Sequence, residues 1–454
     1  MHVAILTAGG AGMYCGSCLQ DNALARAWHA AGHEVSLIPA YTPLTLDTAD
    51  ESLAGPGRGR VFLGGVNLYL KHKSRLWRRL PDWLTGLADR RAVLKLSSKL
   101  GVSNDAADLG PLTVDLLRGE LGPQKAGIEE LVGWIADGLR PDAVLFSNAL
   151  LVGPLRELRR RYDGPVWCVL QGDDIFLDGL REPHKSAALA MISDRAAAFT
   201  GFFTHSEYYA DFMSEFLALP RAKFRTLPLL LETAGLPDEL PADKAGEGGP
   251  FTIGYFARIC PEKGLHLLVE AVGLLRDRRP GVNWTLVCGG YLGPRDKKFF
   301  RSIQKATAGW GGGFEYAGSP GTVAEKRAIL ERFDVLSVPT TYREPKGLPV
   351  LEAWACGVPC VQPAHGAFPE LVGAVGGGVL FEPGDAGELA DRLEQLHDDP
   401  ALRRELGAAG FAGARAKHGP AAVATALRFQ LSEPAPAAGG PADGAPADVP
   451  QPES

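Results

Sequence analysis

The chain has no apolar run that approaches the roughly 20 residues a helix needs to cross a bilayer. Its start, MHVAILTAGG, has no basic segment, no long apolar segment and no small-residue cleavage site, so no secretory signal is predicted. An excess of basic residues is also missing, because 47 lysines and arginines face 53 acidic residues, which disfavours nucleic acid as a partner. These absences predict a cytoplasmic protein.

Cysteine is scarce and forms no recognisable framework. The seven cysteines are an odd number and are scattered, so we expect most to be small buried hydrophobic residues. Cys15 and Cys18 form a C-x-x-C pair at an expected helix start, where a thiolate would be stabilised. No second pair or nearby histidine completes a metal site, so a structural turn is favoured over redox or metal chemistry.

The alternation of short apolar runs with amphipathic stretches defines the fold class. At 454 residues the chain suits two domains of roughly 200 residues each. The pattern predicts parallel α/β layers joined by crossover helices. The expected strands are HVAILT, EVSLIP, DAVLFS, PVWCVL and FFTHS in the first half, and TIGYFA, WTLVC, FEYAG, DVLSVP and PCVQP in the second. We therefore expect an α/β protein of two doubly wound, Rossmann-like domains that face a central cleft.

Composition sets the expected domain boundaries. They are an N-terminal domain at 1–231, a Gly- and Pro-rich linker at 232–250, a C-terminal domain at 251–431 and a disordered tail at 432–454. An insertion at about 50–125 interrupts the first domain, and its stretch 71–91 holds seven basic and two acidic side chains. This stretch is compatible with an interfacial membrane helix or a flap over a bound substrate. A solvated basic helix packed on the domain is the alternative.

A glycine-rich turn, GGAGMYCG at 9–16, follows the first expected strand and precedes a helix. Gly10 and Gly12 lack a Cβ, which would let the backbone approach a bound sugar or phosphate closely. The spacing departs from the dinucleotide fingerprint, and no acidic residue ends the second strand to hold an adenosine ribose, so NAD is disfavoured. A purely structural tight turn remains the alternative.

Two glutamates eight positions apart, Glu344 and Glu352, flank a turn that leads into a helix expected to begin near Gly347. Such a helix start exposes backbone N–H groups and partial positive charge, so a diphosphate can settle there. A carboxylate just before the turn must face the neutral, hydroxyl-bearing part of the ligand, because a position against the phosphates would cost Coulomb repulsion. Hydroxyls together with phosphates indicate a nucleotide-sugar.

Two cations strengthen this interpretation. Arg258 and Lys263 stand five positions apart between a strand end and a helix, where both can converge on one diphosphate. Taken alone, Arg and Lys near a turn are usually solvated surface. Combined with the glutamate pair about 85 positions further on, they predict a diphosphate site.

The second half resembles glycosyltransferase family 4, whose members are retaining enzymes of GT-B fold. The resemblance is carried by the segment from Arg258 to Gly264, the turn VCGGY at 287–291, EPKGLPVLEAWACGVP at 344–359, and Glu370 in FPELV. The first half agrees more loosely, through its glycine loop, AAGHEV at 30–35 and DAVLFSN at 142–148. The likeness covers nearly the whole chain and is most specific from 254 to 370.

This resemblance implies a role for each matching residue. Arg258 and Lys263 would hold the donor diphosphate, and Glu344 would lie beside the transferred sugar. Glu352 would bind the ribose hydroxyls, and the Gly347–Leu348 backbone would complete the phosphate cradle of a nucleotide-sugar-binding C-terminal domain. The resemblance also implies metal-independent transfer, with a nucleoside diphosphate sugar as co-substrate and no further cofactor. The acceptor would be a lipid or glycan hydroxyl that meets the N-terminal domain.

Three positions depart from the family pattern. Pro349 has no N–H to donate where a phosphate-facing amide would be useful. Lys346 stands at a position that is often aromatic in the family. Gln171, in PVWCVLQGDDIFL, stands where many members have a histidine that contacts the donor sugar. A glutamine can still donate and accept hydrogen bonds, but it cannot be protonated near pH 7.

Two further residues near expected strand ends are candidates for the cleft. Asp173, followed by Asp174, can bind sugar hydroxyls or shape the cleft, and an Asp at such a place is as often a helix cap. His205 can reach the cleft, with a packed or capping role as its alternative.

The sequence supports transfer of a sugar from a nucleoside diphosphate donor to an acceptor hydroxyl. One alternative is a catalytically silent nucleotide-sugar-binding protein, for which Gln171 is the main argument. Another is a sugar epimerase or phosphorylase of the same fold. That alternative needs a catalytic base or a cofactor, and the sequence offers neither a base in clear context nor a Schiff-base lysine.

Overall fold

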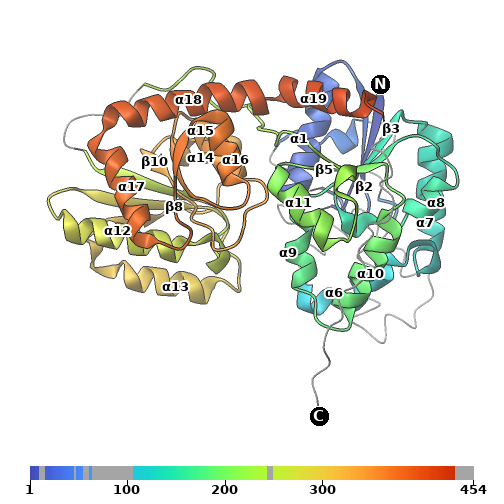
Figure 1. Ribbon diagram of the computed structural model, residues 1–454, viewed down its shortest axis with the longest axis horizontal. Coiled ribbons are helices and arrows are strands. Elements are labelled where there is room, and N and C mark those ends of the chain that lie inside the picture. The colour runs from blue at the N-terminus through green and yellow to red at the C-terminus, as the bar shows by residue number, and fades with distance from the viewer. Residues whose placement is uncertain are drawn as a thin grey trace, which may run out of the picture.

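The chain folds into two parallel-sheet domains that lie side by side (Figure 1). The computed structural model describes residues 1–9, 16–44, 46, 48–54, 61–63, 106–242 and 249–434. Gly10, Gly12, Cys15 and the basic stretch 71–91 lie outside the described residues, and so does the expected tail from 435 onward. Among the described helices, none is both long and apolar enough to pass through a membrane.

The first sheet has six parallel strands in the order β2-β1-β3-β4-β5-β6. Its strands are β1 (His2–Thr7), β2 (Glu34–Pro39), β3 (Ala143–Phe146), β4 (Val166–Val169), β5 (Gly201–Thr204) and β6 (Phe224–Thr226). Successive side chains of β1 enter two different cores, because Ala4 and Leu6 pack on one face of the sheet and Val3 and Ile5 on the other. Burial on both faces explains why these strands read as continuous apolar runs.

The second sheet repeats this architecture with the strand order β12-β11-β10-β7-β8-β9. Its strands are β7 (Phe251–Phe256), β8 (Trp284–Gly289), β9 (Phe314–Tyr316), β10 (Val335–Leu336), β11 (Cys360–Pro363) and β12 (Gly378–Phe381). The ten strands expected from the sequence are all present. The strands β6 and β12 were not expected, because Phe-Arg-Thr is too short and polar to read as an apolar run and β12 begins among glycines.

Helices connect the strands and cover both sheets. In the first domain they are α1 (Gly16–Ala30), α6 (Ala106–Leu117), α7 (Lys125–Gly133), α8 (Leu155–Arg159), α9 (Asp173–Asp178), α10 (His184–Ala196) and α11 (Glu207–Phe216). In the second they are α12 (Leu265–Arg278), α13 (Lys297–Ala306), α14 (Val323–Leu330), α15 (Leu348–Trp354), α16 (Phe368–Val375), α17 (Ala386–Asp398) and α18 (Pro400–His418).

A final helix, α19 (Pro420–Ser432), returns the chain to the first domain. Figure 1 shows α18 running along the second domain and α19 continuing over the first, beside α1. Val423 and Leu427 of α19 are buried in the same core as Trp28 of α1. The second domain therefore ends near Gly419 rather than at 431, because the apolar face of α19 is buried against the first domain.

Candidate active site

The predicted diphosphate residues gather at one point of the second sheet. Strand β7 lies between β10 and β8, so the chain order reverses between β7 and β10. Crevices at the carboxyl ends of strands beside such a reversal are the usual ligand sites of open α/β sheets. Arg258 and Lys263 follow β7, and Tyr342 and Glu344 follow β10. The topology thus brings two segments about 80 positions apart to one crevice.

Lys263 and Glu344 form a buried ion pair at this crevice. The Lys263 Nζ lies 2.6 Å from Glu344 Oε2, and only 6% of Glu344 is exposed. Tyr342 completes the cluster, because its hydroxyl accepts from Lys263 and donates to the same carboxylate. The other carboxylate oxygen accepts from the backbone N–H of Gly347 at 3.4 Å. Glu344 is therefore held by side chains on one oxygen and by the start of α15 on the other.

The cluster fixes the charge of Glu344. Burial alone would raise the pKa of this carboxyl, but the Lys263 charge and the hydrogen bonds from Lys263 and Tyr342 outweigh it and lower the pKa to about 2. Burial and the Glu344 carboxylate raise the pKa of Tyr342. At neutral pH the site therefore holds an ionised glutamate beside a neutral tyrosine.

Two glycines allow the loops of the crevice to approach one another. Gly264 has φ +75°, and a Cβ there would lie 1.7 Å from the carbonyl oxygen of Pro339. Gly366 has φ +62°, and a Cβ there would lie 2.5 Å and 2.6 Å from the backbone O and N of Glu344. Only glycine fits these positions without displacing the backbone that carries Glu344.

Arg258 lies at the rim of the same crevice. This residue is exposed, and its guanidinium lies 3.6 Å from the carboxylate of Glu262, four positions along the chain. Exposed pairs of this kind hold their partners weakly, so the guanidinium is available to an anion that enters the crevice.

The second glutamate of the motif lies between the domains. Glu352 forms a largely buried pair with Lys326, whose Nζ lies 2.9 Å from Glu352 Oε1. Both residues line a cavity of about 60 Å³ that also contacts Leu19 and Gln20 of α1 in the first domain. Helix α15 begins at Leu348, as the sequence predicts, with Gly347 in the left-handed conformation at φ +83°. Leu348 and Glu352 thus face the start of α1 across the cleft.

Gln171 lies on the opposite wall, after β4 of the first sheet. Its amide nitrogen donates to Asp21 Oδ1 at 3.0 Å and to the carbonyl of Ser147 at 3.2 Å. Its carbonyl oxygen accepts from Lys346 of the second domain at 3.5 Å. Two of the three departures from the family pattern, Gln171 and Lys346, therefore contact each other across the cleft.

Asp173, which is buried, and His205, which is partly buried, belong to the same wall. Asp173 accepts backbone N–H groups of Ala149 at 2.6 Å and Gln171 at 2.8 Å, and burial raises its pKa to about 6. His205 Nδ1 contacts the carbonyl of Leu227 at 2.9 Å, while Nε2 has no partner among the described residues. Burial and the charge of Lys346 lower the pKa of His205 to about 4, so it is neutral at pH 7. The contacts of Asp173 are thus with backbone amides that follow strands β3 and β4, and the N-cap of α9 is Gly172.

Three further residues of the site, Lys326, Asp21 and Tyr342, could not be identified from the spacing of residues in the sequence. Lys326 and Asp21 lie on helices far in sequence from their partners, so only the fold pairs them. Tyr342 stands two positions before Glu344, and a preference for a hydroxyl beside a buried carboxylate is too general to identify it.

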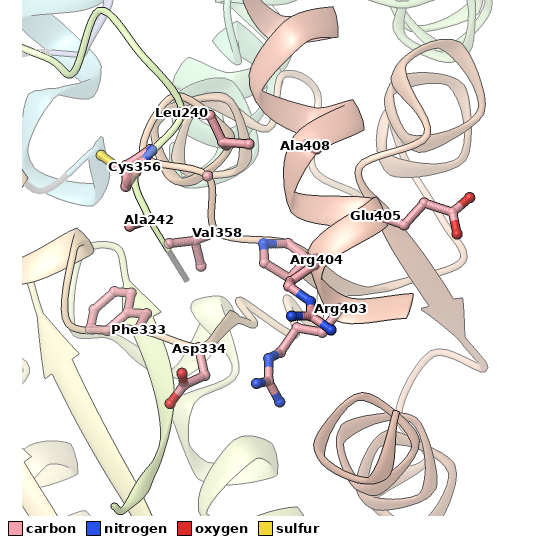
Figure 2. A pocket seen from close by; sticks show the side chains of 13 residues that line it. Leu240, Ala242, Phe333, Asp334, Cys356, Val358, Arg403, Arg404, Glu405 and Ala408 are labelled. Atoms are coloured by element: carbon pink, nitrogen blue, oxygen red, sulfur yellow. The ribbon is translucent and has the colours of Figure 1, made fainter. Parts of the chain in front are cut away.

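A larger cavity of about 360 Å³ lies elsewhere (Figure 2). Phe333 and Asp334, just before β10, face Arg403 and Arg404 of α18 across it. This edge is the amino end of the strands, opposite the crevice of Lys263 and Glu344. Because ligands of open α/β sheets bind at the carboxyl ends of the strands, we place the functional site at the crevice.

Comparisons with known proteins show what the chain is similar to. Residues 238–412 match the family model of group 1 glycosyl transferases. A D-inositol 3-phosphate glycosyltransferase of Pseudarthrobacter chlorophenolicus is 32% identical over 204 residues, which is 45% of this chain and 47% of that protein. A 2-deoxystreptamine glucosyltransferase of Streptomyces kanamyceticus is 35% identical over 34% of this chain and 38% of its own length. The chain spans about half the length or less of these relatives.

Solved structures show the fold over nearly the whole chain. Anabaena HepE in complex with UDP-glucose superposes with a TM-score of 0.62 and 15% identity, covering 95% of this chain and 99% of that one. Sucrose-phosphate synthase of Thermosynechococcus elongatus gives a TM-score of 0.63 and 17% identity, covering 95% and 98%. The predicted GT-B fold of two facing Rossmann-like domains is therefore confirmed, and the C-terminal domain is similar to group 1 glycosyl transferases.

Proposed function

We propose that this chain is a retaining glycosyltransferase of family 4 that moves a sugar from a nucleoside diphosphate donor to an acceptor hydroxyl. The observation that carries the proposal is the buried Lys263–Glu344 pair at the reversal point of the second sheet, with Arg258 at its rim. Such a site combines cations for a diphosphate with a fixed carboxylate for sugar hydroxyls.

The reaction follows from this division of charge. Departure of the diphosphate leaves a sugar ring with oxocarbenium character, so the main task of the protein is to stabilise charge on the leaving group. Arg258 and Lys263 supply that charge, while Glu344 is ionised and steers the sugar. Glu352, beside Leu348, binds the ribose hydroxyls. The departing phosphate takes the acceptor's proton on the same face, which retains the anomeric configuration without a separate protein acid.

The neutral groups of the N-terminal wall suit positioning rather than proton transfer. Gln171 cannot be protonated near pH 7, and the low pKa of His205 keeps it neutral. Gln171 therefore offers a hydrogen bond to the donor sugar where many family members use histidine. The acceptor, a lipid or glycan hydroxyl, enters from the N-terminal domain.

A thermal-shift screen against UDP, GDP and ADP identifies the nucleobase of the donor, because a ligand that binds only the folded protein raises the protein's melting temperature. UDP is the first probe, since HepE was crystallised with it. Radiolabelled donor sugars of the selected base then test chemistry. Slow release of nucleoside diphosphate and free sugar supports transfer. Binding without turnover supports the silent protein, and an isomerised intact donor supports the epimerase; either result overturns the proposal.

A further inference from the structure

The start of helix α11 in the first domain is capped partly by the second domain. The N-cap residue Ser206 accepts the N–H of Tyr209 at 3.2 Å in the ordinary way. The two amides before it, of Glu207 and Tyr208, each donate at 2.7 Å to the carboxylate of Glu370. Glu370 lies on α16, more than 160 positions away. The first three amides of α11 are therefore satisfied by two different domains.

This contact is favourable but reversible. The first amides of a helix lack partners within it, and a carboxylate there gains both charge-assisted hydrogen bonds and the attraction of the helix dipole. Each oxygen of Glu370 takes one amide, which fixes the carboxylate in two directions. The residue is exposed, so water can replace either partner when the domains separate. We call this contact of Glu370 with the amides of Glu207 and Tyr208 the clasp. Because the clasp is exposed, it can form when the domains approach and break when they separate.

The same clasp is connected directly to the loop of Glu344. The N–H of Ala367, at the start of α16, donates to the carbonyl of Glu344 at 2.8 Å. Gly366, the preceding residue, passes so close to the Glu344 backbone that a Cβ there would collide with it. From the other domain, the Ser206 hydroxyl donates to the carbonyl of Pro345 at 3.4 Å. The start of α11 thus touches both α16 and the loop that carries Glu344.

We propose that Glu370 is a positioning residue, whose carboxylate clasps the start of α11 and holds the Glu344 loop against the first domain during transfer. The expected effect of Glu370 on turnover rests on the proposed function, whereas the contact between Glu370 and α11 is independent of that function. Glu370 touches no reacting atom. It sets the distance between the donor site of the second domain and the acceptor side of the first.

Hydrogen exchange tests the clasp without any assay of activity. In the full chain, Glu370→Ala and Glu370→Gln are compared with the natural sequence by mass spectrometry of peptides that contain Glu207 and Tyr208. We expect these amides to exchange about tenfold faster in Glu370→Ala, because a bond to a charged acceptor is lost. The matched control is Glu388→Gln, whose carboxylate accepts a backbone N–H at 2.8 Å within its own domain. Unchanged exchange at 207 and 208 would overturn the proposal.

A second variant approaches the clasp from α11. Glu207 is the first residue of the helix, where proline is well tolerated, and Ser206 before it is extended at φ −154° and ψ 154°. Glu207→Pro therefore removes one donor to Glu370 while keeping the helix. Glu207→Ala is its reference, because it removes the same side chain, with its bond to Arg221, but keeps the N–H.

Donor turnover then separates positioning from simple stability. We expect Glu370→Ala to lower kcat about tenfold or more, with little change in the dissociation constant of the nucleoside diphosphate, which the second domain binds. Glu207→Pro should lower kcat relative to Glu207→Ala and add little to Glu370→Ala. Equal loss of nucleotide binding and turnover would overturn the positioning role. Absence of turnover in the natural chain would overturn the proposed function, while the exchange experiment would still decide the clasp.

Discussion

Replacing Lys263 should destabilise the second domain, because the buried carboxylate of Glu344 then loses its ion-pair partner. One pKa unit corresponds to about 1.4 kcal/mol. The fall of the Glu344 pKa from 4.5 to about 2 therefore makes its ionised form about 3 kcal/mol more stable in the folded protein than in the unfolded chain. The two largest contributions that lower this pKa, a nearby positive charge and a hydrogen bond, both come from Lys263. We expect Lys263→Met to lower the free energy of unfolding by about 3 kcal/mol at pH 7.

Urea unfolding of Lys263→Met, Glu344→Gln, their double variant and one control variant measures this loss. The exposed pair Arg332–Glu315, with side chains 43% and 47% exposed, gives the matched control, and Arg332→Met should cost no more than about 1 kcal/mol. The double variant Lys263→Met with Glu344→Gln should be more stable than Lys263→Met alone, because no buried charge remains. Strictly additive losses in the two single variants and the double variant would refute the reasoning.

The pH dependence has a definite sign. The folded pKa of Glu344 is below its unfolded value, so its contribution is complete above pH 4.5 and is lost as pH falls toward 2. In Lys263→Met that acid loss should shrink. An unchanged acid profile would show that another group lowers the pKa.

Three further predictions concern the surroundings of the site. Gly366→Ala should lower the free energy of unfolding by more than about 2 kcal/mol and reduce turnover. Gly384 is also at positive φ, but a Cβ there would meet nothing within 4 Å, so Gly384→Ala should lower it by only about 1 kcal/mol. Equal urea midpoints of the two variants would contradict this prediction. His205 has a folded pKa of about 4 against an ordinary 6.5, so stability falls as pH drops between these values, and His205→Asn should flatten that part of the curve in thermal unfolding. Arg258→Ala should weaken nucleoside diphosphate binding by about 1.5–3 kcal/mol in calorimetry, and an unchanged dissociation constant would remove Arg258 from the site.

The sequence predicted the elements that depend on local pattern. Buried strands such as HVAILT read as apolar runs, and the turn before Leu348 was visible in its glycine and proline. The placement of Lys263 and Glu344 in one crevice followed from two motifs at strand ends, whereas their direct ion pair was not predicted. These features need only a few neighbouring residues and the rule that parallel strands end at one edge.

Features that depend on distant partners were not predictable in this way. The return of α19 to the first domain follows from the burial of Leu427 against α1, and nothing in its own sequence names that partner. Glu370 was recognised only as part of a motif, because its contact with α11 spans more than 160 positions. Asp173 read as a cleft residue or a cap, and its bonds to two backbone amides depend on how β3 and β4 end.

The most direct test of the central claim is a crystal structure of the full chain with the nucleoside diphosphate selected by thermal shift. We expect the diphosphate within hydrogen-bonding distance, about 3 Å, of Arg258 and Lys263, with the ribose beside Glu352. A nucleotide bound instead in the cavity between Phe333 and Arg404, at the opposite edge of the sheet, would contradict the account.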